Sequence, residues 1–162
     1  MVRWGRLLIV AVVFVPAYMR AQSASASLSV TASVSKNCTI TTSPVSFGAY
    51  DPVVANSTNP LDGTGSVTVT CTKGASATIA LGDGGNYSGG NRRMNQGAAD
   101  FLNYKLYQDS SRSTEWTTAT PMDLGAAPSS SPRTFTVYGR VAGGQGVSVG
   151  SYVDTVLATV NF

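Results

Sequence analysis

Residues 27–35 read SLSVTASVS, a stretch in which apolar side chains alternate with serine and threonine. The apolar set is Leu28, Val30, Ala32 and Val34. Alternation with a period of two residues is typical of a β-strand with one buried and one exposed face. At the end of a mature chain no adjoining turn dictates the partner of such a strand, so it is free to pair with another chain. The first hypothesis for this protein is therefore assembly.

A second alternating stretch, residues 152–162, runs to the last residue of the sequence, with Val156, Ala158, Val160 and Phe162 on one face. Further strand-like runs cover residues 36–42, 65–72, 75–81, 101–108 and 134–141. Between them lie segments rich in Gly, Pro, Asn and Ser, which we expect to be loops, at residues 59–63, 82–90, 121–132 and 143–146. Short strands at this spacing predict an all-β sandwich.

Two of these runs also indicate which side chains face the core. Leu102, Tyr104 and Leu106 alternate with residues of the opposite face, and Phe135 and Val137 alternate with threonines. We expect both sets to point inward. Trp116, near a turn, is expected at the rim of the core rather than as a surface aromatic for glycan stacking.

The first 21 residues have the layout of a secretory signal peptide: two arginines within the first six residues, an almost wholly apolar run at residues 7–18, and small residues from Ala21 onward. The apolar run is too short to span a bilayer of ~30 Å as a helix, so no stable membrane insertion is expected after cleavage. Cleavage after Ala21 or Ser23 fits best, and Ala26 is the latest candidate. The remaining chain of about 141 residues is long enough for one domain.

The charge balance changes once the leader is removed. The full chain has 11 Lys and Arg against 8 Asp and Glu, but Arg3, Arg6 and Arg20 belong to the leader, which leaves the mature chain balanced. Nucleic acid is therefore not an expected partner, because binding its phosphates requires clustered positive charge. The one adjacent basic pair, Arg92 and Arg93, is expected in a solvated loop.

Cys38 and Cys71 are the only cysteines, and the sequence contains no histidine. Two cysteines in an exported chain are expected to form a disulfide. Each lies in a strand-like run, so we expect the bridge to join two neighbouring strands near one end. The alternative, a metal or thiol site, lacks a histidine to complete a ligand set, and the cysteine spacing is not that of a zinc site.

Catalytic residues are not expected. Without histidine there is no Ser-His or Cys-His pair, and the acidic residues are spread singly along the sequence. Asp83, among the glycines of residues 82–86, is similar to part of a calcium loop, but it supplies one carboxylate where Ca²⁺ prefers about six to eight oxygens. We therefore expect a protein that is not an enzyme and that has no metal site and no cofactor.

Four motifs follow one another along the chain: RRM at 92–94, LNYKLYQD at 102–109 with Trp116 beyond it, TVYGR at 136–140, and GSYVDTV at 150–156. Together they resemble the spore coat protein U domain family, which includes the subunits of archaic, Csu-type chaperone-usher pili. The resemblance covers essentially the whole mature chain.

The resemblance implies an incomplete immunoglobulin-like sandwich of the pilin type, residues 36–162, in which a missing last strand leaves an apolar groove. Such subunits are held by a periplasmic chaperone, pass through an outer-membrane usher, and receive the N-terminal strand of another identical or homologous pilin, a form of β-strand addition called donor-strand complementation. Carried over to this sequence, the donor is residues 22–35, with Leu28, Val30, Ala32 and Val34 as its buried face. One groove edge is formed by Tyr152, Val156, Ala158, Val160 and Phe162. The strand-tying bridge falls on Cys38 and Cys71.

The family pattern is broken at one donor position, Ala32, where a larger apolar side chain is usual. Burial of Leu28 and the two valines is worth ~1.5 to 3 kcal/mol each before ordering costs. The alternative for this segment is that residues 24–35 form the first strand of their own domain.

We therefore expect a structural subunit of a cell-surface pilus, exported through the periplasm, that supports surface attachment and biofilm formation. One alternative is a structural protein of a spore coat or surface layer. Another is a pilus tip or adaptor adhesin, which would carry an added binding domain. A secreted enzyme or lectin is the alternative from a different class.

Overall fold

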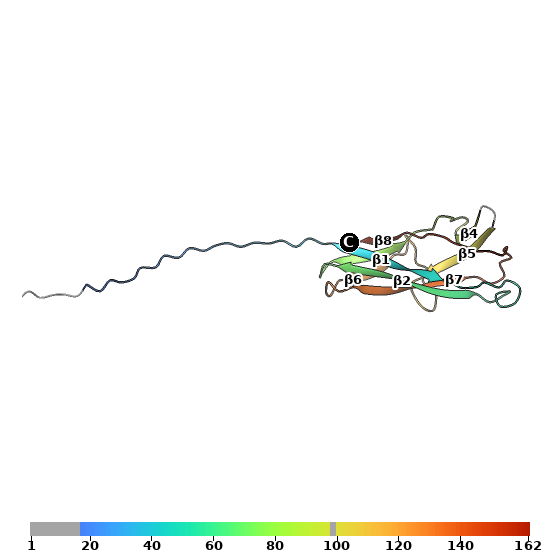
Figure 1. Cartoon of the computed structure of the whole chain (residues 1–162), viewed down its shortest axis with the longest axis horizontal. Coiled ribbons are helices and arrows are strands. Elements are labelled where there is room, and N and C mark those ends of the chain that lie inside the picture. Colours follow the sequence, from blue (N-terminus) through green and yellow to red (C-terminus); the bar gives the residue numbers. More distant parts are fainter. Residues whose placement is uncertain (1–16, 98–99) are drawn as a thin grey trace, which may run out of the picture. The chain divides into compact units, whose positions relative to one another are not determined.

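A computed structural model describes residues 17–97 and 100–162 of the chain, and these residues form strands and loops only (Figure 1). Most of the expected signal peptide lies outside the described residues. The chain divides into two units, one ending at Ser33 and the other spanning residues 34–162. Within the described residues, no helix is long and apolar enough to cross a membrane.

The second unit is a two-layered, immunoglobulin-like β-sandwich. Its strands are β1 (Cys38–Ser46), β2 (Leu61–Cys71), β3 (Ser76–Leu81), β4 (Arg92–Gln96), β5 (Asp100–Tyr107), β6 (Met122–Ala126), β7 (Arg133–Val141) and β8 (Ala158–Asn161). One sheet has the antiparallel order β1-β2-β7-β5-β4, and the other has the antiparallel order β6-β3-β8. The edge strands β1 and β8 belong to different sheets.

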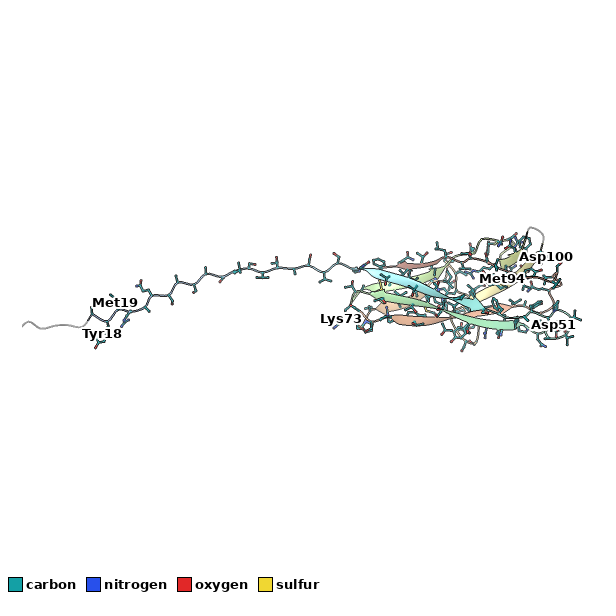
Figure 2. All side chains as sticks on the ribbon, viewed as in Figure 1. Tyr18, Met19, Asp51, Lys73, Met94 and Asp100 are labelled. Atoms are coloured by element: carbon teal, nitrogen blue, oxygen red, sulfur yellow. A yellow bond between two sulfur atoms is a disulfide. The ribbon has the colours of Figure 1, made fainter. Side chains whose placement is uncertain are left out.

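The two ends of the sandwich are easily told apart. Cys38 starts β1 opposite Cys71, the last residue of β2. Lys73 follows at this disulfide end, and Asp51 and Asp100 lie at the opposite end (Figure 2). The C-terminus also lies at the disulfide end, close to the start of β1 (Figure 1).

The core forms where the inner faces of the two sheets meet. Val67 and Val69 of β2 and Ile79 of β3 are almost completely buried, as the alternation in their strands requires. The inward orientation of Leu102, Tyr104, Leu106 and Val137 is confirmed, because each is buried, and Phe135 packs against them from a half-buried position. Trp116 is not at the rim but fully buried, and its indole N–H donates a 2.8 Å hydrogen bond to the carbonyl of Ile79.

Four expectations about loops and strands were wrong. The segment 121–132 contains β6, which pairs with β3, and β2 begins at Leu61, inside the expected loop at 59–63. Arg92 is not in a solvated loop but begins β4, where it is 2% exposed. The expected strand at 152–162 has ladder pairing only over β8.

Arg92 is buried because three inward-facing backbone carbonyls accept hydrogen bonds from its guanidinium group. Its Nε donates a 2.8 Å hydrogen bond to the carbonyl of Gly82, and its Nη2 donates to the carbonyls of Leu81 and Trp116 at 3.0 and 2.8 Å. A buried guanidinium is tolerated when its N–H groups find such acceptors. The carboxylate of Glu115 lies 3.8 Å from Nη1.

Candidate functional site

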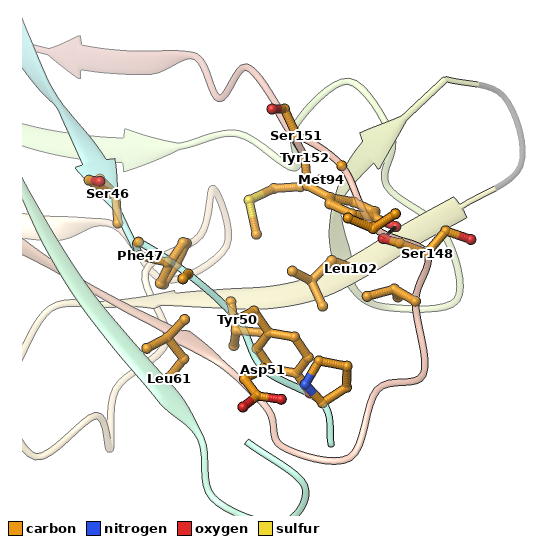
Figure 3. A pocket seen from close by; sticks show the side chains of 18 residues that line it. Ser46, Phe47, Tyr50, Asp51, Leu61, Met94, Leu102, Ser148, Ser151 and Tyr152 are labelled. Atoms are coloured by element: carbon orange, nitrogen blue, oxygen red, sulfur yellow. Dashed lines mark hydrogen bonds between the residues drawn. The ribbon is translucent and has the colours of Figure 1, made fainter. Parts of the chain in front are cut away.

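A groove runs along the side of the sandwich where the edge strands of the two sheets face each other. It contains two cavities of about 430 and 730 Å³, whose walls come from residues 42–52 on the β1 side and residues 147–158 on the C-terminal side. The larger cavity opens at the end of the sandwich that carries Asp51 (Figures 2 and 3). The groove floor is apolar and includes Leu102 and Leu106 of β5.

The C-terminal wall of the groove has a free edge. β8 pairs with β3 on one side and has no ladder partner on the other among the described residues. Residues 152–157 precede it without ladder pairing, apart from an isolated bridge between Val153 and Asn95. Their exposure nevertheless alternates as in a strand, with the even-numbered residues turned inward.

The structure places the expected edge residues unequally. Tyr152, Val156 and Ala158 line the cavities, and they pack against the core together with Val160. Val160 itself lies beyond the cavity linings, and Phe162 is 52% exposed. The hollow part of the groove therefore ends near Ala158, before the disulfide end of the sandwich.

The opposite wall is built on glycines. Gly63 of β2 and Gly139 of β7 are directly paired, and the ring of Phe47 lies across them. A Cβ atom added at Gly139 would lie 2.7 Å from the ring of Phe47 and 2.8 Å from Val45, closer than real Cβ contacts. The missing side chains therefore create the seat that Val45 and Phe47 occupy.

Phe47 stands at a waist between the two cavities. Four residues line both of them: Val45, Phe47, Met94 and Tyr152. Figure 3 shows Met94 and Tyr152 on one side of the larger cavity and Phe47, Tyr50 and Leu61 on the other. A chain that occupied both cavities would have to pass this waist.

One inward-facing residue of the C-terminal wall is acidic. Asp154 accepts hydrogen bonds from the hydroxyl of Tyr104 at 2.7 Å, from the backbone N–H of Gly85 at 2.9 Å and from its neighbour Thr155 at 2.9 Å. Burial, reinforced by the bond to Asp154, raises the pKa of Tyr104 well above its ordinary value. This polar cluster ties the irregular segment 152–157 to β5 and to the loop that follows β3.

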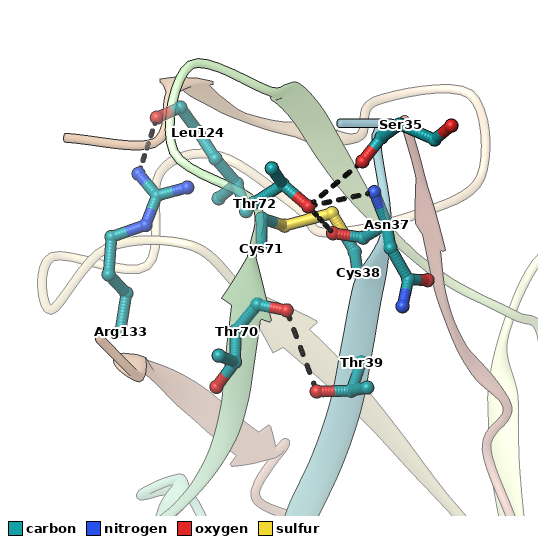
Figure 4. Close-up of a disulfide and its surroundings, with 9 residues drawn as sticks. All are labelled: Ser35, Asn37, Cys38, Thr39, Thr70, Cys71, Thr72, Leu124 and Arg133. Atoms are coloured by element: carbon teal, nitrogen blue, oxygen red, sulfur yellow. Dashed lines mark hydrogen bonds between the residues drawn. A yellow bond between two sulfur atoms is a disulfide. The ribbon is translucent and has the colours of Figure 1, made fainter. Parts of the chain in front are cut away.

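The expected disulfide is present. Cys38 and Cys71 form the first pair of the β1–β2 ladder, with their Cα atoms 4.1 Å apart (Figure 4). Next to the bridge, the hydroxyl of Thr72 donates to the carbonyl of Ser35 at 3.3 Å and accepts from the N–H of Asn37 at 3.2 Å. These bonds fix the chain at the point where it enters β1.

The expected donor residues lie outside every strand of the structure. Leu28, Val30 and Val34 are 88%, 86% and 85% exposed, and Ala32 is also exposed. The alternative that residues 24–35 form the first strand of their own domain does not match this structure, in which β1 begins at Cys38.

The described residues contain no group of three or more Cys, Asp or Glu side chains placed to hold a metal ion. The glycine-rich loop with Asp83 instead donates hydrogen bonds to Asp154 through Gly85 and Asn86. Sequence reasoning missed Phe47, Met94 and Asp154 as groove residues. Asp154 could have been found as the one acidic residue on the inward face of an otherwise apolar alternating stretch.

Comparisons with known proteins agree with this architecture. The family model of the Spore Coat Protein U domain matches residues 24–159. The chain is 40% identical over 164 aligned residues to Protein U of Myxococcus xanthus, with 93% of this chain and 90% of that protein covered.

Among solved structures, it is similar to a chain in the crystal structure of the CsuC-CsuE chaperone-tip adhesion subunit pre-assembly complex from archaic chaperone-usher Csu pili of Acinetobacter baumannii. That similarity has a TM-score of 0.57 at 21% identity and covers 80% of this chain but only 40% of the other, so it concerns the fold. The family match over residues 24–159 and the 40% identity to Protein U show that this chain belongs to the Spore Coat Protein U domain family.

Proposed function

We propose that this protein is a structural subunit of an extracellular fibre of the archaic chaperone-usher type, and that its copies join by donor-strand complementation. Residues 22–35 of one copy would fill the groove of the next. The observation that carries the proposal is a groove with a free strand edge in a chain that also has an exposed, alternating segment. The segment could pair with the free strand edge and bury its apolar face in the groove, and the groove would thereby be filled.

The complementarity of length supports the proposal. The apolar positions from Leu28 to Val34 span six residue steps, or ~20 Å at about 3.3 Å per residue in a strand. The part of the C-terminal wall that lines the smaller cavity, from Tyr152 to Ala158, spans the same number of steps. A donor of this length covers the smaller cavity and reaches the waist.

The remaining parts of the proposal follow from the same groove. An open apolar groove is an aggregation hazard before assembly, so we propose that a periplasmic chaperone covers it after the signal peptide is removed, and that an outer-membrane usher passes subunits to the cell surface. Support comes from the solved structure to which this fold is similar, which is described as a complex of a chaperone with a pilus subunit. Surface attachment and biofilm formation would be properties of the fibre.

A second candidate is a structural protein of a spore coat. The name of the family, the Spore Coat Protein U domain, favours it. The same strand exchange would join subunits in either assembly, and electron microscopy of producing cells with and without this chain separates a fibre from a coat layer.

The test compares two substitutions in the donor segment of the full chain, expressed with its chaperone and usher. Val30→Asp places a charge on the apolar face, and we expect it to abolish polymers, because an unpaired carboxylate in an apolar groove is very costly. Ser29→Asp is the matched control on the polar face and should leave assembly intact. Polymers are measured as ladders in unboiled gel samples and as fibres by electron microscopy.

Two chain-level variants complete the test. Deletion of residues 24–34 should give subunits that cannot cap a neighbour. Fusion of the same residues behind Phe162 through a flexible linker should give a stable monomer with its groove filled in cis. Normal polymers from the Val30→Asp or deletion variant, or unchanged polymerisation of the fused chain, would contradict strand exchange.

A further inference from the structure

We propose that the groove accepts the donor in one register, in which Ala32 of one copy lies opposite Asp154 of the next. The proposal rests on the function proposed above and specifies which donor residue lies opposite which residue of the groove wall. It explains two irregularities together: the small side chain on the apolar face of the donor, and the acidic side chain on the inward face of the C-terminal wall.

The direction of the donor follows from where the groove is hollow. The cavities extend from Ala158 to the end of the sandwich that carries residues 48–52 and 147–151. The copy that supplies the donor must lie at this open end, with Val34 nearest to its own body. The donor then runs from the disulfide end toward the open end, whereas residues 152–158 run the opposite way. The pairing is therefore antiparallel.

The alternation of apolar and polar residues in the donor allows only a few pairing registers with the C-terminal wall. Directly opposed residues of an antiparallel pair share a face, so the apolar donor face stays in the groove only if the pairing slides by two residues at a time. The inward positions of the wall are Tyr152, Asp154, Val156 and Ala158. A donor that pairs along these four positions therefore places one of its inward-facing residues opposite Asp154.

Ala32 is the donor residue that suits this position. The carboxylate of Asp154 already holds the Tyr104 hydroxyl at 2.7 Å and the Gly85 N–H at 2.9 Å. A branched side chain pressed against it would strip water from the charge without offering a hydrogen bond. The ring of Phe47, whose centroid lies 6.1 Å from that of Tyr104, lines the same smaller cavity as Asp154.

The same register fits the other three positions by size. Leu28, the largest donor side chain, lies opposite Ala158, the smallest residue of the wall. Val30 lies opposite Val156, and Val34 lies opposite Tyr152, at the waist between the two cavities. Moving the donor by two residues in either direction puts a valine against Asp154.

The register is tested with cysteine pairs on the outward faces, which leave the groove untouched. In the proposed register Thr31 lies opposite Thr155, and both are exposed. The full chain carrying Thr31→Cys and Thr155→Cys should therefore form polymers whose subunits are joined covalently, seen as a ladder in boiled, non-reduced samples that collapses on reduction. The controls pair Thr31→Cys with Val153→Cys or with Leu157→Cys, which are offset by two residues and should cross-link at least about tenfold less, because diagonal neighbours are too far apart.

A second measurement uses side-chain size. Ala32→Leu should lower the temperature at which polymers dissociate, whereas Val30→Ile, which enlarges the donor opposite Val156, should be tolerated. Ladders from either offset pair, or polymers of unchanged stability with Ala32→Leu, would overturn the register while leaving strand exchange in place. Absence of polymers from the unsubstituted chain would instead contradict the proposed function, and the register with it.

Discussion

The hydroxyl of Tyr104 donates a 2.7 Å hydrogen bond to the carboxylate of Asp154, which joins β5 in the core to the irregular segment before β8. The segment is also held by backbone hydrogen bonds between Val153 and Asn95 and from Gly82 to Leu157, so the side-chain bond adds a further attachment where ladder pairing is missing. Together these bonds hold one wall of the groove in place while the groove is open.

Replacing Tyr104 by Phe should lower the free energy of unfolding by about 1 to 3 kcal/mol, the range for a buried hydrogen bond to a charged group. The ring stays in the core, so packing is preserved, and the loss is that of the hydroxyl alone. Denaturant unfolding of the monomeric, self-complemented chain measures it. Tyr138→Phe, on a half-buried residue of β7 whose hydroxyl takes part in none of the hydrogen bonds described above, serves as the control, and an equal loss in both variants would contradict a special role for Tyr104.

The same residue predicts a pH dependence. Burial, and then the bond to Asp154, raises the pKa of Tyr104 above its ordinary value of 10.0, so the folded state holds this proton more tightly than the unfolded chain does. The contribution to stability is complete below pH about 10 and is lost as the pH rises further. Tyr104→Phe should therefore lose less stability than the unsubstituted chain between neutral pH and pH about 11. Parallel pH profiles would contradict the assignment.

Gly139→Ala should destabilise the sandwich by about 1 to 3 kcal/mol, as expected for overpacking. Its Cβ would lie 2.7 Å from the ring of Phe47, which has to move off its seat. Gly146→Ala is the matched control, because a Cβ there meets nothing within 4 Å. Thermal unfolding compares the two, and equal midpoints would show that Phe47 does not depend on the glycine seat.

Arg92→Lys should cost about 2 to 4 kcal/mol, because an ammonium cannot reach all three carbonyls that the guanidinium serves, and unsatisfied buried carbonyls are expensive. Arg93→Lys is the neighbouring control. Arg93 is half-buried, stacks over Phe101 at 4.0 Å and donates to the carbonyl of Asn86, so its replacement should cost less than about 1 kcal/mol. A larger loss at Arg93 than at Arg92 in denaturant unfolding would refute this ranking.

Replacing both Cys38 and Cys71 by Ala should reduce stability by about 3 to 4 kcal/mol, the chain-entropy value for a loop of this size. The unsubstituted protein should lose the same amount in a reducing agent, which provides the internal control. A thiol assay on native, exported protein should find no free cysteine, and two titratable thiols would contradict the bridge.

The strands that could be predicted from the sequence are those in which apolar and polar residues alternate. Residues 101–108 and 134–141 alternate clearly, and each forms a strand with the expected face inward. β4 could not be predicted in this way, because four of its five residues, RRMNQ, are polar, and it forms a strand through pairing with β5 and the burial of one arginine. β6 lies in a segment rich in proline and serine, and its pairing with β3 decides its conformation.

In the candidate site too, features with a local sequence signal could be predicted, and features that depend on pairing between distant residues could not. The alternation at residues 28–34 and 152–162 and the two cysteines are local signals. The waist at Phe47 depends on the register that places Gly63 opposite Gly139, which are far apart in the sequence. The C-terminal alternation predicted a longer strand than β8, because residues 152–157 alternate as a strand does but, within the described residues, form only one isolated bridge, between Val153 and Asn95.

The position of the disulfide has a mechanical consequence. In the fibre proposed here, tension would reach each subunit through its N-terminal segment and arrive at Cys38, the first residue of an edge strand. Without a bridge, the load would be carried by the hydrogen bonds between β1 and β2 alone. The covalent link passes the load to Cys71, at the end of β2, which is paired with a strand on each side. The load is then shared by the hydrogen bonds that β2 makes with both β1 and β7. The subunit should therefore resist extension at the N-terminal end of β1.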